Sequence, residues 1–148
     1  MIQVQEQDFH VQELYQNLLE ANVTGAVAMF VGLVRHFSDL PVEDCGFELE
    51  HYPGMTEHNL KSIVHEAKEK WPLLDVTVVH RVGRLSINDQ IVFVGVSAVH
   101  RAEAFAACDF IMDYLKSRAA FWKKETQGDN SQWVSAAEKD ELSLKRWS

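Results

Sequence analysis

Hydrophobic and polar residues alternate with several different periods along the chain, and each period predicts a different element. Ile2 and Val4 alternate with glutamines, which predicts a short strand. Apolar residues at helical spacing over 11–19 predict a helix, for which Asp8 is the expected N-terminal cap. The apolar segment 25–34, GAVAMFVGLV, has the length and β-branched content of a buried strand, although its periodicity alone leaves a helix open.

Strand-like and helical periods then alternate through the middle of the chain. Residues 47–52 alternate as a half-exposed strand does, and Thr56 is the expected cap of a helix that Pro72 ends. Residues 76–85 and 90–99 each predict a strand, and the polar SIND segment between them predicts a hairpin turn.

The last third of the chain predicts a long helix followed by two short strands. The helix should begin near His100 and run to about Arg118, with its apolar residues on one face. FWKKE at 121–125 and the pair Trp133-Val134 are expected strands. Strong hairpin signals, without a glycine-rich phosphate loop, predict the α+β class with a largely antiparallel sheet.

One domain covering residues 1–148 is expected, because a chain of this length can bury a full core by itself. The polar segment 36–46 contains a proline and predicts a mobile loop. Residues 127–148 are expected to form a mobile C-terminal tail. Both segments are expected to become ordered when a substrate or a partner binds.

Charge narrows the class of ligand. The chain has a net charge of −8, whereas a nucleic-acid partner requires a broad basic surface. Residues 114–124 nevertheless hold four basic side chains and no acid, which favours either a small anionic ligand or a solvated helix end whose cations suit the helix dipole. The chain lacks an apolar run long enough to span a membrane, and residues 1–9 do not resemble a secretory signal, so a cytoplasmic location is expected.

Several polar side chains occupy positions suited to chemistry. His100-Arg101 opens the predicted long helix and could bind a phosphate there, although a plain cap with a solvated arginine stays open. Lys116 and Lys123 could act as general acid, general base or amine nucleophile, with an exposed surface position as the alternative. Arg35 ends the predicted buried strand, either to face a ligand or to mark where the strand reaches the surface.

Spacing limits how these residues can combine. His100-Arg101 and Lys116 lie about four turns apart on one helix, so they share a site only if another segment or another subunit brings them together. Cys45 and Cys108 are far apart in the sequence, which favours two reduced cysteines with Cys108 in the core. The histidines and acidic residues lack the spacing of a metal site.

Motifs in this order and at this spacing resemble the large, catalytic subunit of molybdopterin synthase, the MoaE family. The resemblance covers about residues 24–134, and its most specific segments are LEHYPGMTE, FIMDYLK and FWK. The segments that carry it are GAVAMFVGLVR at 25–35, LEHYPGMTE at 49–57, VHRVG at 79–83, VFVGV at 92–96 followed by His100-Arg101, FIMDYLK at 110–116 and FWK at 121–123.

The resemblance implies an α/β hammerhead fold with an additional antiparallel β subdomain. It also implies a sulfurtransferase of molybdenum cofactor biosynthesis, which makes molybdopterin from cyclic pyranopterin monophosphate by two sulfur transfers. The sulfur donor would be the C-terminal Gly-Gly thiocarboxylate of a small ubiquitin-like subunit, and one such subunit would dock at each end of a homodimer to form a heterotetramer. A bound metal or cofactor is not expected, nor is a nucleic-acid or membrane partner.

The same resemblance implies the site residues. Lys116 and Lys123 match the family's catalytic lysines. We expect Lys116 to be the acid/base group and Lys123 mainly to hold the thiocarboxylate or the phosphate. The positions that match the family's phosphate and pterin pocket are Arg35, His100, Arg101 and Phe30.

The chain also departs from the family pattern. Arg84 and Asn88 stand where relatives often carry an acid and a turn glycine, and Ala137 stands where some relatives carry an arginine. Three rival functions stay open: an anion-binding module without turnover, an inactive scaffold subunit and a cysteine-dependent sulfurtransferase. The first would need neither lysine, and the last would need a reactive Cys108.

Overall fold

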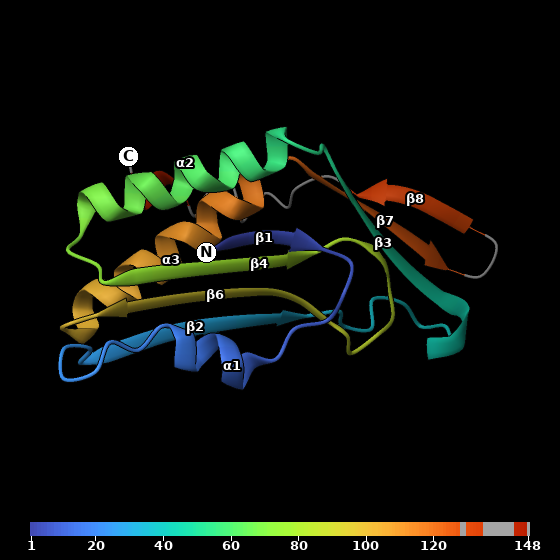
Figure 1. Cartoon of the computed structure of the whole chain (residues 1–148). Helices are drawn as coiled ribbons and strands as arrows, with labels where there is room; N and C mark the ends of the chain where they lie inside the picture. Colours follow the sequence, from blue (N-terminus) through green and yellow to red (C-terminus); the bar gives the residue numbers. More distant parts are fainter. Residues whose placement is uncertain (128–129, 135–143, 148) are drawn as a thin grey trace.

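The computed structural model describes residues 1–127, 130–134 and 144–147 and arranges them in two four-stranded sheets with three α-helices (Figure 1). The elements are β1 (Ile2–Gln5), α1 (Val11–Asn17), β2 (Ala26–Leu33), the 3-10 helix η1 (Val42–Asp44), β3 (Cys45–His51), α2 (Met55–Lys70), β4 (Asp75–Arg81), β5 (Gly83–Leu85), β6 (Gln90–Ala98), α3 (Arg101–Arg118), β7 (Phe121–Gln127), β8 (Asn130–Val134) and the 3-10 helix η2 (Lys145–Trp147). The strand orders are β1-β4-β6-β2 and β5-β3-β7-β8. Among the described pairs only β1 and β4 are parallel, so the predicted α+β class is confirmed.

The first sheet carries the main core because helices cover both of its faces (Figure 1). On one face, Ile63 of α2 and Ile111 of α3 join Val94 of β6 in a buried cluster. On the other face, Leu18 at the end of α1 packs against Phe93. Strands buried on both faces consist of nearly continuous apolar residues, which is why β4 and β6 lack a clear polar side.

The prediction of one strand over 76–85 is wrong, because the chain bends after β4. Gly83 has a φ of 86°, in the left-handed region that glycine adopts without strain. The bend directs β5 to β3 in the second sheet, while β4 pairs with β6 in the first. The SIND segment therefore leads from one sheet to the other and does not close a two-stranded hairpin.

The two predicted side-chain caps do not form. The Oδ1 atom of Asp8 accepts a hydrogen bond from the Nε2 of Gln90, and α1 begins three residues later. Thr56 lies inside α2, where its Oγ1 accepts the N–H of Tyr52 and donates to the carbonyl of Ala120. Both side chains do satisfy backbone or side-chain groups, but the partners Gln90 and Ala120 are distant in the sequence.

The segments predicted to be mobile contain some regular structure. The range 36–46 includes η1 and the first two residues of β3. The range 127–148 includes β8 and η2, and its other part, with Ala137, lies outside the described residues. Mobility of either segment stays a prediction.

Candidate functional site

Lys116 and Lys123 lie on either side of a two-residue connection between α3 and β7. Lys116 is in the last turn of α3. Strand alternation puts Lys123 on the same face of β7 as Phe121 and Glu125. The Nζ atom of Lys123 is 3.9 Å from a Glu125 carboxylate oxygen and 5.9 Å from the centre of the Phe47 ring. The short connection thus holds both lysines near the junction of the two sheets.

A buried histidine lies at the same junction. His80, near the end of β4, is 5% exposed, and its ring stacks on Phe121 with 3.8 Å between ring centres and 19° between planes. Its Nδ1 is 2.8 Å from the carbonyl oxygen of Arg81. We refer to Lys116, Lys123, His80 and Phe121 together as the lysine site.

Burial keeps His80 uncharged. Loss of solvent lowers the pKa of His80 to about 4, the hydrogen bond to the Arg81 carbonyl opposes this, and the charges of Lys116 and His51 lower the pKa further. A carbonyl oxygen only accepts hydrogen bonds, so the proton is on Nδ1 and Nε2 keeps its lone pair. The positive charge of the lysine site at neutral pH therefore comes from lysines and not from this imidazole.

Arg35 lies at the same end of the first sheet as Lys116. Leu33, at the end of β2, pairs with Gln90 at the start of β6, and Arg35 follows two residues later. α3 begins just after β6 and packs back along it, which brings Lys116 to that end. Phe30 is in the middle of β2, the edge strand of the sheet, and is 41% exposed.

His100 and Arg101 lie at the opposite end of α3. His100 is the N-cap and Arg101 the first helical residue. At about 1.5 Å per residue, roughly 24 Å of helix separates His100 from Lys116. A single copy of the chain therefore brings Arg35 to the end that holds the lysine site but leaves His100-Arg101 apart from it.

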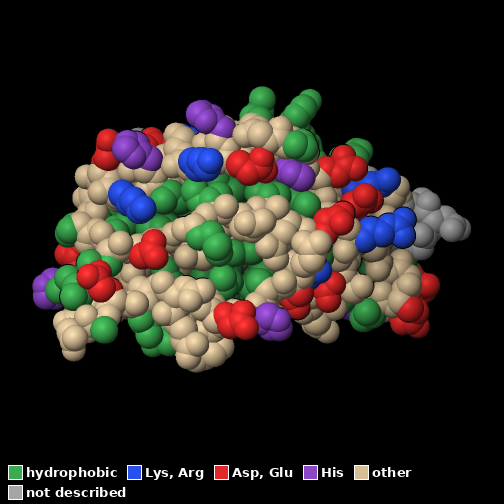
Figure 2. All heavy atoms as spheres, viewed as in Figure 1, with side chains coloured by type: hydrophobic (Ala, Val, Ile, Leu, Met, Phe, Trp, Pro, Cys, Tyr) green, Lys and Arg blue, Asp and Glu red, His purple; other side chains and the backbone are tan. Residues whose placement is uncertain are grey.

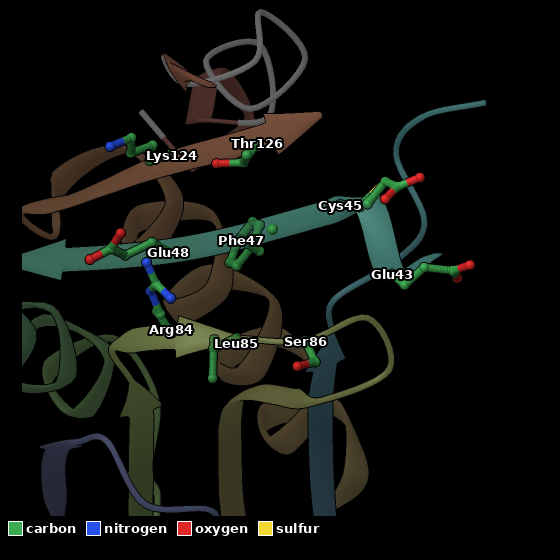
Figure 3. A pocket seen from close by; sticks show the side chains of 11 residues that line it. Glu43, Cys45, Phe47, Glu48, Arg84, Leu85, Ser86, Lys124 and Thr126 are labelled. Atoms are coloured by element: carbon green, nitrogen blue, oxygen red, sulfur yellow. The ribbon is translucent and has the colours of Figure 1, made fainter. Parts of the chain in front are cut away.

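A hollow of about 530 Å³ is present on the second sheet, and none of the six predicted residues lines it (Figure 3). Glu48 of β3 lies between its strand partners Arg84 of β5 and Lys124 of β7. Lys124 points to the face of β7 opposite Lys123, because successive strand residues alternate. The charged side chains of Glu48, Arg84 and Lys124 are therefore on the other face of the second sheet from Lys123.

Basic and acidic side chains are mixed on the visible face of the molecule (Figure 2). On the face shown in Figure 2, cations near the end with β3, β7 and β8 lie beside acidic side chains and do not form one broad basic area. Within the described ranges there is no group of three metal-ligating side chains, and no helix long and apolar enough to cross a membrane.

Cys108 lacks the surroundings of a reactive thiol. Cys108 is buried, as predicted, and burial, with the nearby Asp109 charge, raises the pKa of its thiol to about 11. Cys45 is half-buried with its Sγ 3.6 Å from the Pro41 carbonyl oxygen. The thiolate is the reactive form of cysteine, so the cysteine-dependent rival loses its support.

Sequence reasoning missed His80, Phe121 and Glu125 as parts of the site. His80 had one local signal, since it ends the otherwise apolar run VTVV in β4. Phe121 and Glu125 share the period-2 face of Lys123 in the strand that the sequence predicts over 121–125, but the stacking of Phe121 on His80 joins β7 to β4 and has no signal in the sequence.

Comparison with known proteins supports one family. A family model described as "MoaE protein" matches residues 4–118. The molybdopterin synthase catalytic subunit of Vibrio cholerae is 49% identical, over 99% of this chain and 97% of that protein. The Escherichia coli protein of the same name is 51% identical, over 95% of this chain and 93% of that protein.

Comparison with solved structures supports the same family. The molybdopterin biosynthesis MoaE protein from Burkholderia ambifaria has a TM-score of 0.83 at 49% identity, covering 99% of this chain and 96% of that one. A complex of subunits 1 and 2 of the molybdopterin-converting factor from Helicobacter pylori has a TM-score of 0.74 at 20% identity, over 93% and 91%, which shows a shared fold. With its sequence and fold matched over nearly their whole length, the chain belongs to the MoaE family.

Proposed function

We propose that the chain is the catalytic subunit of molybdopterin synthase, a sulfurtransferase of molybdenum cofactor biosynthesis. It converts cyclic pyranopterin monophosphate to molybdopterin with two sulfurs from a thiocarboxylated small subunit. One observation carries the proposal: known catalytic subunits are identical to this chain at about half of their positions, over nearly its full length. A cytoplasmic location remains part of the proposal.

The chemistry of the lysine site suits this reaction. The sulfur arrives on the partner, so the enzyme requires no reactive thiol of its own, in keeping with the raised pKa of Cys108. Both the phosphate of the substrate and the thiocarboxylate of the donor are anions, which ammonium groups bind. Lys116 is proposed to donate a proton to the leaving oxygen, and Lys123 to hold an anion while charge develops.

The partner subunit would approach the lysine site with an extended C-terminal tail. An extended peptide needs a groove or a sheet edge to bind. The Helicobacter pylori structure, a complex of two subunits, has this fold in one of them, which supports a small-subunit partner for this chain.

A second copy of the chain is proposed to complete the site. β2 is an unpaired edge of the first sheet, and Met29, Phe30 and Leu33 on it are exposed, an arrangement that favours pairing between copies. A two-fold axis beside β2 would place the start of one β2 next to the end of the other. His100-Arg101 of one copy would then approach Arg35 and Lys116 of the other, at the centre of a heterotetramer.

Reconstitution tests the function directly. The protein is mixed with a thiocarboxylated small subunit and cyclic pyranopterin monophosphate, and molybdopterin is measured by mass spectrometry. Wild type should form product, and Lys116→Ala and Lys123→Ala should each lower the rate by about a hundredfold or more, as loss of an acid/base or charge-stabilising group does.

The neighbour of Lys123 provides the matched control. Lys124 lies on the opposite face of β7, where its Nζ is 5.8 Å from the Trp133 ring centre, and Lys124→Ala should keep the wild-type rate. Product from wild type and from both lysine variants would reject the assigned roles. A confirmed complex that makes no product would favour an anion-binding module without turnover.

A further inference from the structure

His80 occupies a position that links the two lysines. Among the described residues it is the one buried histidine. Its ring stacks on Phe121, the first residue of β7, and Lys123 follows two residues later on the same face. Lys116 belongs to the helix that leads into this strand, and its charge acts on the imidazole.

Contacts on the other side hold the connection between α3 and β7. From α2, the Oγ1 of Thr56 donates to the carbonyl of Ala120 at 2.7 Å and the Nδ2 of Asn59 donates to the carbonyl of Arg118 at 3.1 Å. The His80 ring supports the first residue of β7, Phe121, from β4. The segment between the lysines is therefore held from two elements.

The groups that face His80 explain why a neutral ring is suited to this place. Lys116 comes from α3, His51 from β3, Phe121 from β7 and the Arg81 carbonyl from the end of β4. A charged side chain here would change the field at a site that must bind two anions. A neutral aromatic ring fills the space, packs on Phe121 and adds no charge.

We propose that His80 is a positioning residue of the sulfur-transfer site, whose neutral ring supports Phe121 so that Lys123 is held in register with Lys116. The inference rests on the proposed function and extends it to a residue that need not touch the substrate. It assigns the effect to the ring and not to the ring nitrogens.

Two substitutions distinguish the effect of the aromatic ring from the effect of its nitrogen atoms. His80→Phe keeps a stacking ring and removes both nitrogens, whereas His80→Asn keeps a donor near the Nδ1 position and removes the ring. In the reconstituted reaction we expect His80→Asn to lower the rate at saturating small subunit about 10- to 100-fold, the scale of a misplaced catalytic group. We expect His80→Phe to stay within about threefold of wild type, and both KM values to change less than kcat.

Controls make each outcome decisive. His65→Asn changes an exposed histidine of α2 and should match wild type, and the melting temperature of each variant shows whether it is folded at the assay temperature. A folded His80→Asn with the wild-type rate, or an equal loss in folded His80→Phe and His80→Asn, overturns the proposal. If wild type itself makes no product, the proposed function fails and this inference fails with it.

Discussion

At the scale of single residues, the alternation of side chains along β7 decides which of two adjacent lysines faces the lysine site. Lys123 shares its face of β7 with Phe121 and Glu125, whereas Lys124 lies near the ring of Trp133 on the other face. Two residues of equal charge and neighbouring sequence position therefore have different surroundings. Resemblance to a family identified Lys123, and the backbone pairing supplies a physical reason for the difference.

His80 should make the protein sensitive to acid. Its pKa is lowered from 6.5 to about 4 in the folded state, so between these pH values the unfolded chain binds more protons than the folded one. Stability is then lost as the pH falls from about 6.5 to 4, by up to about 3 kcal/mol for this one group.

Urea unfolding at pH 7 and at pH 4.5 measures this loss. The fall in unfolding free energy should be smaller in His80→Phe, which cannot take up the proton, than in wild type. His65→Asn, at an exposed position, should retain the wild-type pH dependence. Equal pH dependence in wild type and His80→Phe would show that the pKa of His80 is the same in the folded and the unfolded chain.

At the scale of elements, the end of the chain is anchored to the helices. Arg146 of η2 forms ion pairs of 2.7 Å with Asp109 and 2.6 Å with Asp113 of α3. The ring of Trp147 lies edge-on to Trp71 and Phe110, with 5.9 Å and 5.5 Å between ring centres. The contact extends the core on the side of the first sheet that α2 and α3 cover.

Replacing Trp147 should weaken the attachment of η2 to the helices. Trp147→Ala should lower the free energy of unfolding by about 2 kcal/mol, less than for a fully buried tryptophan because the side chain is only half-buried. Urea unfolding followed by circular dichroism measures the change. Trp133→Ala, at a position 55% exposed, is the control and should cost less than about 1 kcal/mol. Equal losses would show that η2 does not contribute to the core.

At the scale of the whole molecule, the distance between His100-Arg101 and Lys116 determines whether one copy of the chain can form a site that uses both. The long axis of α3 separates them within one copy, so a site that uses both must draw on two copies. Such a shared site has a consequence that a self-contained site lacks: two inactive variants can restore each other.

Complementation should reveal the shared site. Co-expressed Lys116→Ala and Arg101→Ala chains should form mixed dimers in which one of the two sites has every residue intact. In purified mixed dimers one of the two sites is intact, so product formation should rise to about half of the wild-type level.

The control pairs two substitutions from the same side of the site. Lys116→Ala with Lys123→Ala leaves each site of a mixed dimer with one lysine missing, so activity should not return. Complementation is measured on purified mixed dimers, carrying a different affinity tag on each chain. No recovery with Arg101→Ala, despite isolated mixed dimers, would place the complete site within one copy.

Much of the fold was predictable because element type depends on local periods. The long helix from about 100 to 118, the strands around FWKKE and Trp133-Val134, and the end of α2 before Pro72 were predicted close to their observed bounds. The single strand over 76–85 was wrong, since only the pairing partners show that β5 belongs to the other sheet. Neither predicted cap formed, because α1 and α2 begin at other residues, and the side chains of Asp8 and Thr56 have partners that include the distant Gln90 and Ala120.

Periodicity and motif spacing are local properties of a chain, and they were enough to predict the α+β class, the long helix over about 100–118, the buried Cys108 and the family. The spatial neighbours were found only in the folded chain: His80 lies beside Phe121 and near Lys116, Arg35 lies at the end of the first sheet that holds Lys116, and His100-Arg101 lies at the other end. Those relations depend on contacts between residues far apart in the sequence. The pKa of His80 follows from the same contacts, since burial and nearby charge exist only after the chain has folded.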